Sequence, residues 1–312
     1  MDSFREQFEK HVTHDSIEVN GIRLHYVFTG KEDAPPVILL HGFPQSWVTW
    51  RYVIPTLAAS HRVIAVDLRG YGDSEKPSGI NGYDNKTMAG DIQGLMRRLH
   101  IQKALIAGHD RGARVARRLA LDAPELAAGL VLIDIMPTEY VYDSLTAAEA
   151  AKKYWHWTFQ VVPHLPEELI KGKEEEYLRF LLSRGDGLFD LLASDGAWDR
   201  YLAAWKQPGA VQAALNDYRA AYQIDLPRYR SEKESQKKLD VPTLLLWGEK
   251  GNLAGLPVLD TWRESIREVS GYEVKGCGHY VPEEKPTEAA RRIIDFSKTV
   301  FKGCTTPKQT DS

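Results

Sequence analysis

Residues 104–112 read Ala104-Leu105-Ile106-Ala107-Gly108-His109-Asp110-Arg111-Gly112. The first four residues are apolar and predict a buried strand, and a helical pattern begins just after the second glycine. This small-x-nucleophile-x-small order is typical of a strained turn between a strand and a helix, with glycines where the two elements nearly touch. The stretch therefore predicts a reactive side chain at the end of a sheet strand.

The reactive position holds Asp110, where such turns usually carry serine. A serine attacks acyl carbons, whereas a carboxylate suits attack on a saturated carbon, with release of a halide or opening of an epoxide. Aspartate is also a common N-cap of helices, but a plain cap requires neither Gly108 nor Gly112. We therefore interpret Asp110 as a nucleophile.

Further strands are predicted on both sides of this turn. The pair Asn20-Gly21 between two alternating segments predicts a hairpin. Short apolar runs of the kind found in parallel sheets occur at Val37–Leu40, Val63–Val66, Ala104–Ala107, Leu130–Ile133, Val241–Trp247 and Tyr272–Val274. Helical stretches such as Lys86–Arg98 and Ala113–Asp122 lie between them. This alternation predicts an α/β fold, with an open parallel sheet covered by helices on both faces.

The alternation stops near Pro137, and residues 138–225 carry no strand signal. They are rich in Trp, Tyr, Leu and Ala, with charge-dense helical pieces such as Glu167–Arg179. Because the strand pattern resumes afterwards, we favour a helical insertion over the carboxyl edge of the sheet over a second independent domain. We expect a core of residues 1–137 and 226–302, a helical cap of residues 138–225 and a flexible tail of residues 303–312.

Length and composition limit the class of protein. The chain has 312 residues and a formal net charge of −3, so neither nucleic acid nor an anionic membrane is expected as a partner. No apolar run approaches the ~18 residues of a membrane-spanning helix, and the first residues are too polar for a secretory signal. Cys277 and Cys304 are far apart in the sequence, which fits a reducing compartment without a disulfide framework. We expect a cytoplasmic protein that acts on a small molecule.

A carboxylate nucleophile forms an ester, so a water and a general base are needed to clear it. Histidine titrates in the right range, and His279 lies in a glycine-rich turn after the last strand signal. The base in turn needs an acid to fix its tautomer. Asp134 directly ends an apolar strand, whereas the alternative, Glu249, lies in a charged turn. We prefer Asp134, because the carboxyl ends of parallel strands meet at one crevice.

Arg111 and Arg114 lie within one helical turn of Asp110. They could be solvent-exposed, as we expect of Arg117 and Arg118. The helix after such a turn normally packs on the sheet, however, and a buried arginine needs an anionic partner. One acid cannot satisfy both, so the substrate is expected to supply a second anion. A guanidinium clamp would offset the repulsion between two carboxylates, about 4 kcal/mol at roughly 4 Å and an effective dielectric constant of about 20.

Two further groups are candidates for the same site. The turn His41-Gly42-Phe43-Pro44 follows a strand, and the backbone N–H of Phe43, together with that of Arg111, could form an oxyanion hole for ester hydrolysis. Aromatic residues cluster at 154–157 and around Tyr218. Aromatics at helical spacing are more often core, but their N–H and O–H groups are the donors that a departing halide or an epoxide oxygen requires.

Three motifs together resemble one branch of the α/β-hydrolases, which contains haloalkane dehalogenases, epoxide hydrolases and haloacetate dehalogenases. They are His41-Gly42-Phe43-Pro44, Gly70-Tyr71-Gly72-Asp73-Ser74 and Gly108-His109-Asp110-Arg111-Gly112. The similarity extends over roughly residues 15 to 300. It implies the α/β-hydrolase fold, with a mostly parallel eight-stranded sheet and a helical cap. A more specific similarity, to fluoroacetate (haloacetate) dehalogenases, rests on Asp110-Arg111, Arg114, His156-Trp157 and Tyr218.

This resemblance implies a role for each candidate residue. Asp110 would displace halide from haloacetate, and His279, supported by Asp134, would activate the water that releases glycolate. Arg111 and Arg114 would bind the substrate carboxylate. The halide would be bound by His156, Trp157 and Tyr218. The family uses no metal or organic cofactor, and its members commonly form homodimers.

Two other functions remain open at this stage. An epoxide hydrolase would use the same triad, with tyrosines of the cap as proton donors; the candidates are Tyr154, Tyr218 and Tyr222. A non-catalytic ligand receptor on a hydrolase scaffold belongs to another class of function. The presence of a complete triad argues against the receptor.

Overall fold

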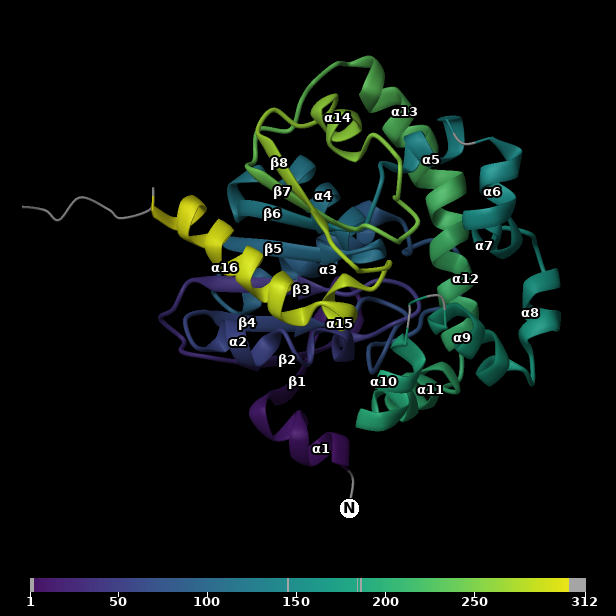
Figure 1. The fold of residues 1–312 in the computed structure, drawn as a ribbon, viewed down its shortest axis with the longest axis horizontal. Helices are drawn as coiled ribbons and strands as arrows, with labels where there is room; N and C mark the ends of the chain where they lie inside the picture. Colours follow the sequence, from purple (N-terminus) through teal and green to yellow (C-terminus); the bar gives the residue numbers. More distant parts are fainter. Residues whose placement is uncertain (1–2, 145, 184, 186, 303–312) are drawn as a thin grey trace, which may run out of the picture.

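The computed structural model describes residues 3–144, 146–183, 185 and 187–302. The tail predicted at residues 303–312 lies outside this part of the chain. A single eight-stranded sheet runs through the molecule in the order β1-β2-β4-β3-β5-β6-β7-β8, with helices on both of its faces (Figure 1). No helix of the described residues is long and apolar enough to cross a membrane.

The strands lie where the apolar runs predict them. Their bounds are β1 (Thr13–Val19), β2 (Ile22–Thr29), β3 (Pro36–Leu40), β4 (Arg62–Val66), β5 (Ala104–His109), β6 (Ala127–Ile133), β7 (Thr243–Gly248) and β8 (Val269–Val274). β1 and β2 form the predicted hairpin, and β2 pairs antiparallel with β4. All pairs from β4 to β8 are parallel. The prediction of an α/β-hydrolase fold with a mostly parallel eight-stranded sheet is confirmed.

Short and long helices surround this sheet. They are α1 (Ser3–Gln7), α2 (Ile54–Ala58), α3 (Asn85–Arg98), α4 (Arg111–Asp122), α14 (Val258–Arg263), α15 (Val281–Glu284) and α16 (Pro286–Phe301), with 3-10 turns at Glu9–His11, Trp47–Trp50 and Pro124–Leu126. α4 follows β5 directly, and every residue from Arg111 to Ala120 is buried. A helix buried on all sides lies between layers, so its polar side chains must find partners inside the protein.

The described residues between β6 and β7 contain helices and no strand. They form α5 (Thr138–Ser144), α6 (Ala147–Lys153), α7 (Trp155–Gln160), α8 (Leu165–Ile170), α9 (Glu174–Leu182), α10 (Leu188–Asp195), α11 (Ala197–Trp205), α12 (Ala210–Ala220), the π-helix η4 (Ala221–Asp225) and α13 (Leu226–Glu234). We call α5 to η4 the inserted helices. In Figure 1 they lie together at one end of the sheet.

Two details of the inserted helices differ from what the sequence pattern suggests. The helical piece predicted over Glu167–Arg179 is two helices, because the chain breaks at Gly172, whose φ of +75° is left-handed. At the other end, α12, η4 and α13 follow one another without a loop. The boundary predicted at residue 225 therefore falls inside a continuous helical run that joins the inserted helices to α13.

Candidate active site

The turn between β5 and α4 has the strained geometry that the glycines predict. Asp110 has φ 47° and ψ −113°, a conformation that non-glycine residues rarely adopt. A Cβ placed on Gly108 would lie 2.4 Å from the carbonyl oxygen of Gly112, and one on Gly112 would lie 2.4 Å from that of His41. Only glycine fits at either position. Surrounding structure therefore maintains the strain at Asp110 and fixes its side chain at the tip of the turn.

The structure brings the three predicted triad residues together at the carboxyl ends of three parallel strands of the sheet. Asp110 follows β5, Asp134 follows β6, and His279 follows β8. His279 Nδ1 lies 2.6 Å from Asp134 Oδ2, and His279 Nε2 lies 3.9 Å from Asp110 Oδ2. The first contact is a hydrogen bond that sets the orientation of the imidazole ring. The second is too long for one, so the Asp110 carboxylate is near the imidazole of His279 without being hydrogen-bonded to it.

The alternative acid, Glu249, has a different role in the structure. Its carboxylate accepts a hydrogen bond from the backbone N–H of Gly276 at 2.8 Å and pairs with Lys275 at 3.1 Å. Asp134 instead accepts from the backbone N–H of Gly248 at 2.9 Å with its other oxygen. Of these two acids, Asp134 is thus the one placed against His279.

Backbone groups also contact the nucleophile. The N–H of Phe43 donates to Asp110 Oδ1 at 3.0 Å. Arg111 is the first residue of α4, and the first N–H groups of a helix have no partner within the helix. Gly42 allows the close approach, because a Cβ there would lie 2.5 Å from Asp110 Cβ. The N–H of Phe43 is therefore within hydrogen-bond distance of the Asp110 carboxylate, while an oxyanion hole formed with the N–H of Arg111 stays a prediction.

Electrostatics keep the nucleophile ionised. Burial alone would raise the pKa of Asp110, but the nearby His279 opposes it most strongly, with smaller contributions from His109, Arg111 and Arg114. Together these groups lower the pKa of Asp110 to about 2. The carboxylate is therefore negatively charged, and nucleophilic, at any ordinary pH.

The four arginines of α4 are all buried, and three of them pair with carboxylates. Arg117 pairs with Glu139 at 3.0 Å, and Arg118 with Asp122 and, at 2.6 Å, with Glu232. Arg111 pairs with Asp217 of α12: its Nε donates at 2.9 Å, and its Nη2 donates to the carboxylate and to the backbone oxygen. The expectation that Arg117 and Arg118 are solvent-exposed is wrong, because α4 is enclosed on every side.

Arg114 is the exception among the arginines of α4. Its Nη1 donates to Thr138 Oγ1, and its guanidinium lies 4.8 Å from the ring centre of Trp157. Its Nε and Nη2 are buried and have no hydrogen-bond partner among the described residues. Burial lowers the pKa of Arg114, and the neighbouring Arg111 lowers it further. A buried cation in this state favours an external anion.

The two arginines predicted to bind a substrate carboxylate therefore differ. Arg114 lines the cavity that contains Asp110, whereas the guanidinium of Arg111 is engaged with Asp217 and is not part of the cavity wall. Binding of a substrate carboxylate by both side chains stays a prediction. In the structure the carboxylate of Asp217 occupies the guanidinium of Arg111 and would compete with the substrate for it. Tyr71 also donates to Asp217, at 2.7 Å.

The cavity is small and joins the core to the inserted helices. It has about 20 Å³ of space for water, so it suits a small ligand unless side chains move. The residues that line it include every side chain predicted for the triad, the substrate carboxylate and the halide, except Arg111. They are Phe43, Asp110, Arg114, Asp134, Ile135, Met136, Val141, Tyr154, His156, Trp157, Tyr218, Asn252, Leu253 and His279.

The predicted halide-binding residues come from two of the inserted helices. His156 and Trp157 lie on α7 and Tyr218 on α12, and all three are buried. The ring of Tyr218 lies 6.0 Å from that of His156 and 6.1 Å from that of Trp157. Tyr154 also lines the cavity. Tyr222 does not, because its side chain is 47% exposed on the outside of η4. Of the tyrosines considered as proton donors, only Tyr154 and Tyr218 reach the cavity.

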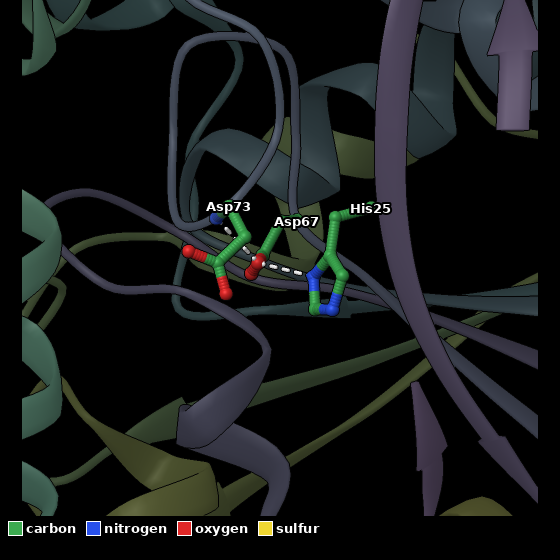
Figure 2. Close-up of side chains that lie close together, drawn as sticks. All are labelled: His25, Asp67 and Asp73. Atoms are coloured by element: carbon green, nitrogen blue, oxygen red, sulfur yellow. Dashed lines mark hydrogen bonds and ion pairs between the residues drawn. The ribbon is translucent and has the colours of Figure 1, made fainter. Parts of the chain in front are cut away.

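A separate cluster of possible metal ligands lies between β2 and the turn after β4. The ligand atoms of His25, Asp67 and Asp73 lie within 4.8 Å of one another (Figure 2). Asp67 accepts hydrogen bonds from His25 Nδ1 at 2.7 Å, from the backbone N–H of Trp47 at 2.7 Å and from that of Asp73 at 2.9 Å. These bonds occupy both oxygens of the buried carboxylate. The cluster is thus explained as an anchor for the turn that contains Gly70 and Gly72.

Comparison with known proteins agrees with this geometry. The alpha/beta hydrolase fold family model matches residues 35–286. The soluble epoxide hydrolase of Corynebacterium sp. (strain C12) is 35% identical over 287 residues, which cover 91% of this chain and 97% of that protein. The fluoroacetate dehalogenase of Burkholderia sp. is 31% identical over 301 residues, covering 93% and 94%. A solved structure of the epoxide hydrolase CorEH without ligand has a TM-score of 0.83 at 33% identity, covering 94% of this chain and all of that one.

Proposed function

The chain belongs to the alpha/beta hydrolase fold family, and we propose that it is a hydrolytic dehalogenase that converts haloacetate into glycolate and halide. The relatives named above support a hydrolase that acts either on carbon–halogen bonds or on epoxides. The choice of a haloacid as substrate, and the roles of the residues below, are our own inference from the site.

In the first step, a carboxylate oxygen of Asp110 attacks the carbon that bears the halogen. A C–O bond forms while the carbon–halogen bond breaks, and the halide leaves with the electron pair. The product is an ester between Asp110 and the acid. Donors on His156, Trp157 and Tyr218 face the same cavity and can receive the halide, which matters most for fluoride because its charge is concentrated.

In the second step, His279 Nε2 takes a proton from a water molecule, whose oxygen attacks the carboxyl carbon of Asp110. The tetrahedral oxyanion forms where the N–H of Phe43 already donates. Asp134 stabilises the imidazolium through its bond to Nδ1. When the C–O bond to the substrate breaks, the glycolate oxygen takes up the proton. Asp110 is regenerated with one oxygen derived from water, and the second proton of that water is released to solvent as the carboxyl group ionises.

One observation favours an acid as substrate: Arg114 is a buried cation with two nitrogens lacking a partner in the described part of the chain, in the wall of the cavity that holds Asp110. A neutral substrate would leave this charge uncompensated. A substrate carboxylate would pair with it and offset the repulsion from Asp110, about 4 kcal/mol at roughly 4 Å and an effective dielectric constant of about 20. The small cavity supports a short acid.

An epoxide hydrolase is the second candidate, and two observations favour it. Tyr154 and Tyr218 both line the cavity, where their hydroxyl groups could donate to an epoxide oxygen. Two of the three proteins compared above, one sequence relative and one solved structure, carry that name. The same attack by Asp110 and the same hydrolysis by His279 would then give a diol.

The two candidates are separated by one set of assays. The purified protein is incubated with fluoroacetate, chloroacetate and a panel of small epoxides, and halide and diol are measured. We expect halide release from at least one haloacid and none from the Asp110→Ala variant. Diol formation without halide release would instead assign the epoxide reaction.

The covalent step is tested in heavy-oxygen water under single-turnover conditions. The label should appear in the carboxylate of Asp110, because the ester carbonyl is the site that water attacks. Label in the product alone would show that water attacks the substrate directly, and it would remove the proposed mechanism for either substrate.

A further inference from the structure

The peptide that carries His279 is held on both sides by one carboxylate. Glu284, on the short helix α15 that follows, accepts a hydrogen bond from the backbone N–H of Gly278 at 2.6 Å with Oε2 and from that of Tyr280 at 2.9 Å with Oε1. These are the residues immediately before and after His279. A charged acceptor makes such bonds stronger than neutral ones. Glu284 therefore fixes the main chain on either side of the base.

The backbone carbonyl of His279 lies between those two N–H groups, and a residue of another strand binds it. His109, the last residue of β5, lies with its Nε2 2.9 Å from the backbone oxygen of His279. A carbonyl oxygen can only accept, so Nε2 must carry the hydrogen. The two imidazole rings lie 4.8 Å apart. His109 thus connects the nucleophile turn to the loop of the base, across the sheet.

The charge state of His109 suits this role. Burial, with the nearby His279 as the next cause, lowers the pKa of His109 to about 3. The ring stays neutral at ordinary pH and does not repel the imidazolium that forms on His279 during hydrolysis. The Nε2 hydrogen is donated to the carbonyl of His279, and with a pKa of about 3 the other ring nitrogen, Nδ1, is too weak a base to replace His279.

We propose that His109 and Glu284 are positioning residues for His279, and that they control hydrolysis of the ester rather than its formation. This inference rests on the proposed function, because it assigns the two residues to one of its two steps. Neither residue touches the reacting atoms. Both bind backbone groups at or next to His279, which does touch them.

The two steps depend on different parts of the structure. Ester formation needs the Asp110 carboxylate, which is placed by the strained turn and by the N–H of Phe43. Hydrolysis also needs His279 Nε2 aligned with a water molecule. A displacement of about 1 Å can cost roughly 100-fold in rate. Loosening the loop of His279 should therefore slow the second step and leave the first nearly unchanged.

The test uses matched substitutions at His109. His109→Gln keeps an N–H donor at a similar reach, whereas His109→Met keeps the size and loses the donor. With chloroacetate or a turned-over epoxide as substrate, rapid quenching and mass spectrometry measure the ester on Asp110. We expect His109→Met to slow ester hydrolysis about 10- to 100-fold, with ester formation within about 3-fold of the parent, so the ester accumulates. His109→Gln should behave like the parent protein.

Glu284→Gln is the second arm, since it leaves one acceptor for two N–H groups and lies away from the nucleophile turn. It should also accumulate ester. Glu288→Gln removes a carboxylate of α16 that pairs with Arg291 and Arg292, and it serves as the control for loss of charge alone. An equal loss of both rates in His109→Met and Glu284→Gln, or ester in neither, would overturn the inference.

The His279→Asn variant separates this inference from the proposed function. If it accumulates ester while the two positioning variants do not, only the positioning role is wrong. If it never forms ester with any substrate that the parent turns over, the covalent mechanism itself is wrong.

The proton on His279 Nδ1 provides a readout without substrate: its NMR signal should shift in Glu284→Gln and not in Glu288→Gln.

Discussion

The two halves of the cavity differ in how the chain holds their functional groups. On the core side, Asp110, Asp134 and His279 follow three strands of one sheet, and each is fixed by main-chain bonds or strained backbone. On the side of the inserted helices, His156 and Tyr218 are aromatic rings that lie 6.0 Å apart on two helices outside the sheet, α7 and α12. The core half can thus keep one chemistry while the other half changes its substrate.

Arg111 and Arg114 lie at the boundary between these halves. Both belong to α4 of the core, three positions apart, yet Arg111 binds Asp217 of an inserted helix while Arg114 faces the cavity. One arginine therefore connects the two halves, and the other is available to a ligand. Substitutions in each half, and at each arginine, should have effects of different kind and size.

The largest effect is expected in the core half, from Asp110→Ala. Without a nucleophile no ester can form, so turnover should fall by about 10⁴-fold or more. The melting temperature should change little, since the strained turn is maintained by Gly108 and Gly112. Halide release or diol formation measures the first quantity and thermal unfolding the second. Activity above a few per cent of the parent would show that the core half does not supply the nucleophile.

Next in size is the contrast between the two arginines. Arg114→Met should reduce kcat/KM for a haloacid about 100-fold, because loss of one partner of a buried charge pair costs roughly 2–5 kcal/mol. A neutral epoxide should be affected by less than about 3-fold. Equal losses for charged and neutral substrates would contradict the proposed pairing with Arg114.

Arg111→Met should act on stability instead. It leaves the buried carboxylate of Asp217 without its cation. Such a loss lowers the free energy of unfolding by about 3–5 kcal/mol. The free energy of unfolding in urea measures this loss. The double variant Arg111→Met/Asp217→Leu should recover much of it. A stable Arg111→Met protein with impaired binding of haloacids would return Arg111 to the role that the sequence suggested.

These arginines also show where sequence reasoning reaches its limit. The nucleophile turn, the strands and the choice of Asp134 over Glu249 follow from local signals: glycines around Asp110, and an acid at the end of an apolar run. The partner of Arg111 is 106 positions away in the chain. No periodicity links the two, so only the packing of α12 on α4 reveals the pair.

A similar limit applies to the exposure of single residues. Its charge predicts that Arg117 lies at the surface, but α4 is enclosed and Arg117 forms an ion pair with Glu139. Tyr222 lies four positions after Tyr218, and the sequence predicts the same proton-donor role for both. In the structure Tyr222 is in the π-helix η4 and is exposed, whereas Tyr218 is buried.

A smaller effect is expected among the inserted helices, from Trp157→Phe. The ring remains for packing against Arg114, but the indole N–H donor is lost. We expect roughly a 10-fold larger loss in kcat for fluoroacetate than for chloroacetate, because the smaller halide depends more on hydrogen bonds as it leaves. Halide-selective electrodes measure both. Equal losses would mean that Trp157 shapes the cavity without binding the halide.

The smallest effect on activity is expected from a substitution of Asp225, which lies where the inserted helices join the core. Asp225, in η4, accepts the backbone N–H of Asn85 from α3 at 3.0 Å and shares the guanidinium of Arg228 with Asp84. Burial raises the pKa of Asp225 from 3.8 to about 7, against the opposing effect of its hydrogen bond with Asn85. A raised carboxyl pKa means that the folded state binds this proton more tightly. Its contribution to stability is complete below about pH 4 and is lost as the pH rises through 7.

Asp225→Asn should remove that dependence while leaving turnover unchanged, because the amide keeps an acceptor for Asn85 and never ionises. Between pH 5 and 8, the melting temperature of the parent should fall relative to that of the variant by a few degrees, on the order expected for about 1 kcal/mol. Thermal unfolding at several pH values measures the difference. If the melting temperatures of the parent and the variant changed equally with pH, Asp225 would be ionised over the whole range from pH 5 to 8. The junction would then be held by a buried ion pair with Arg228, and the connection between the two halves would rest on charge.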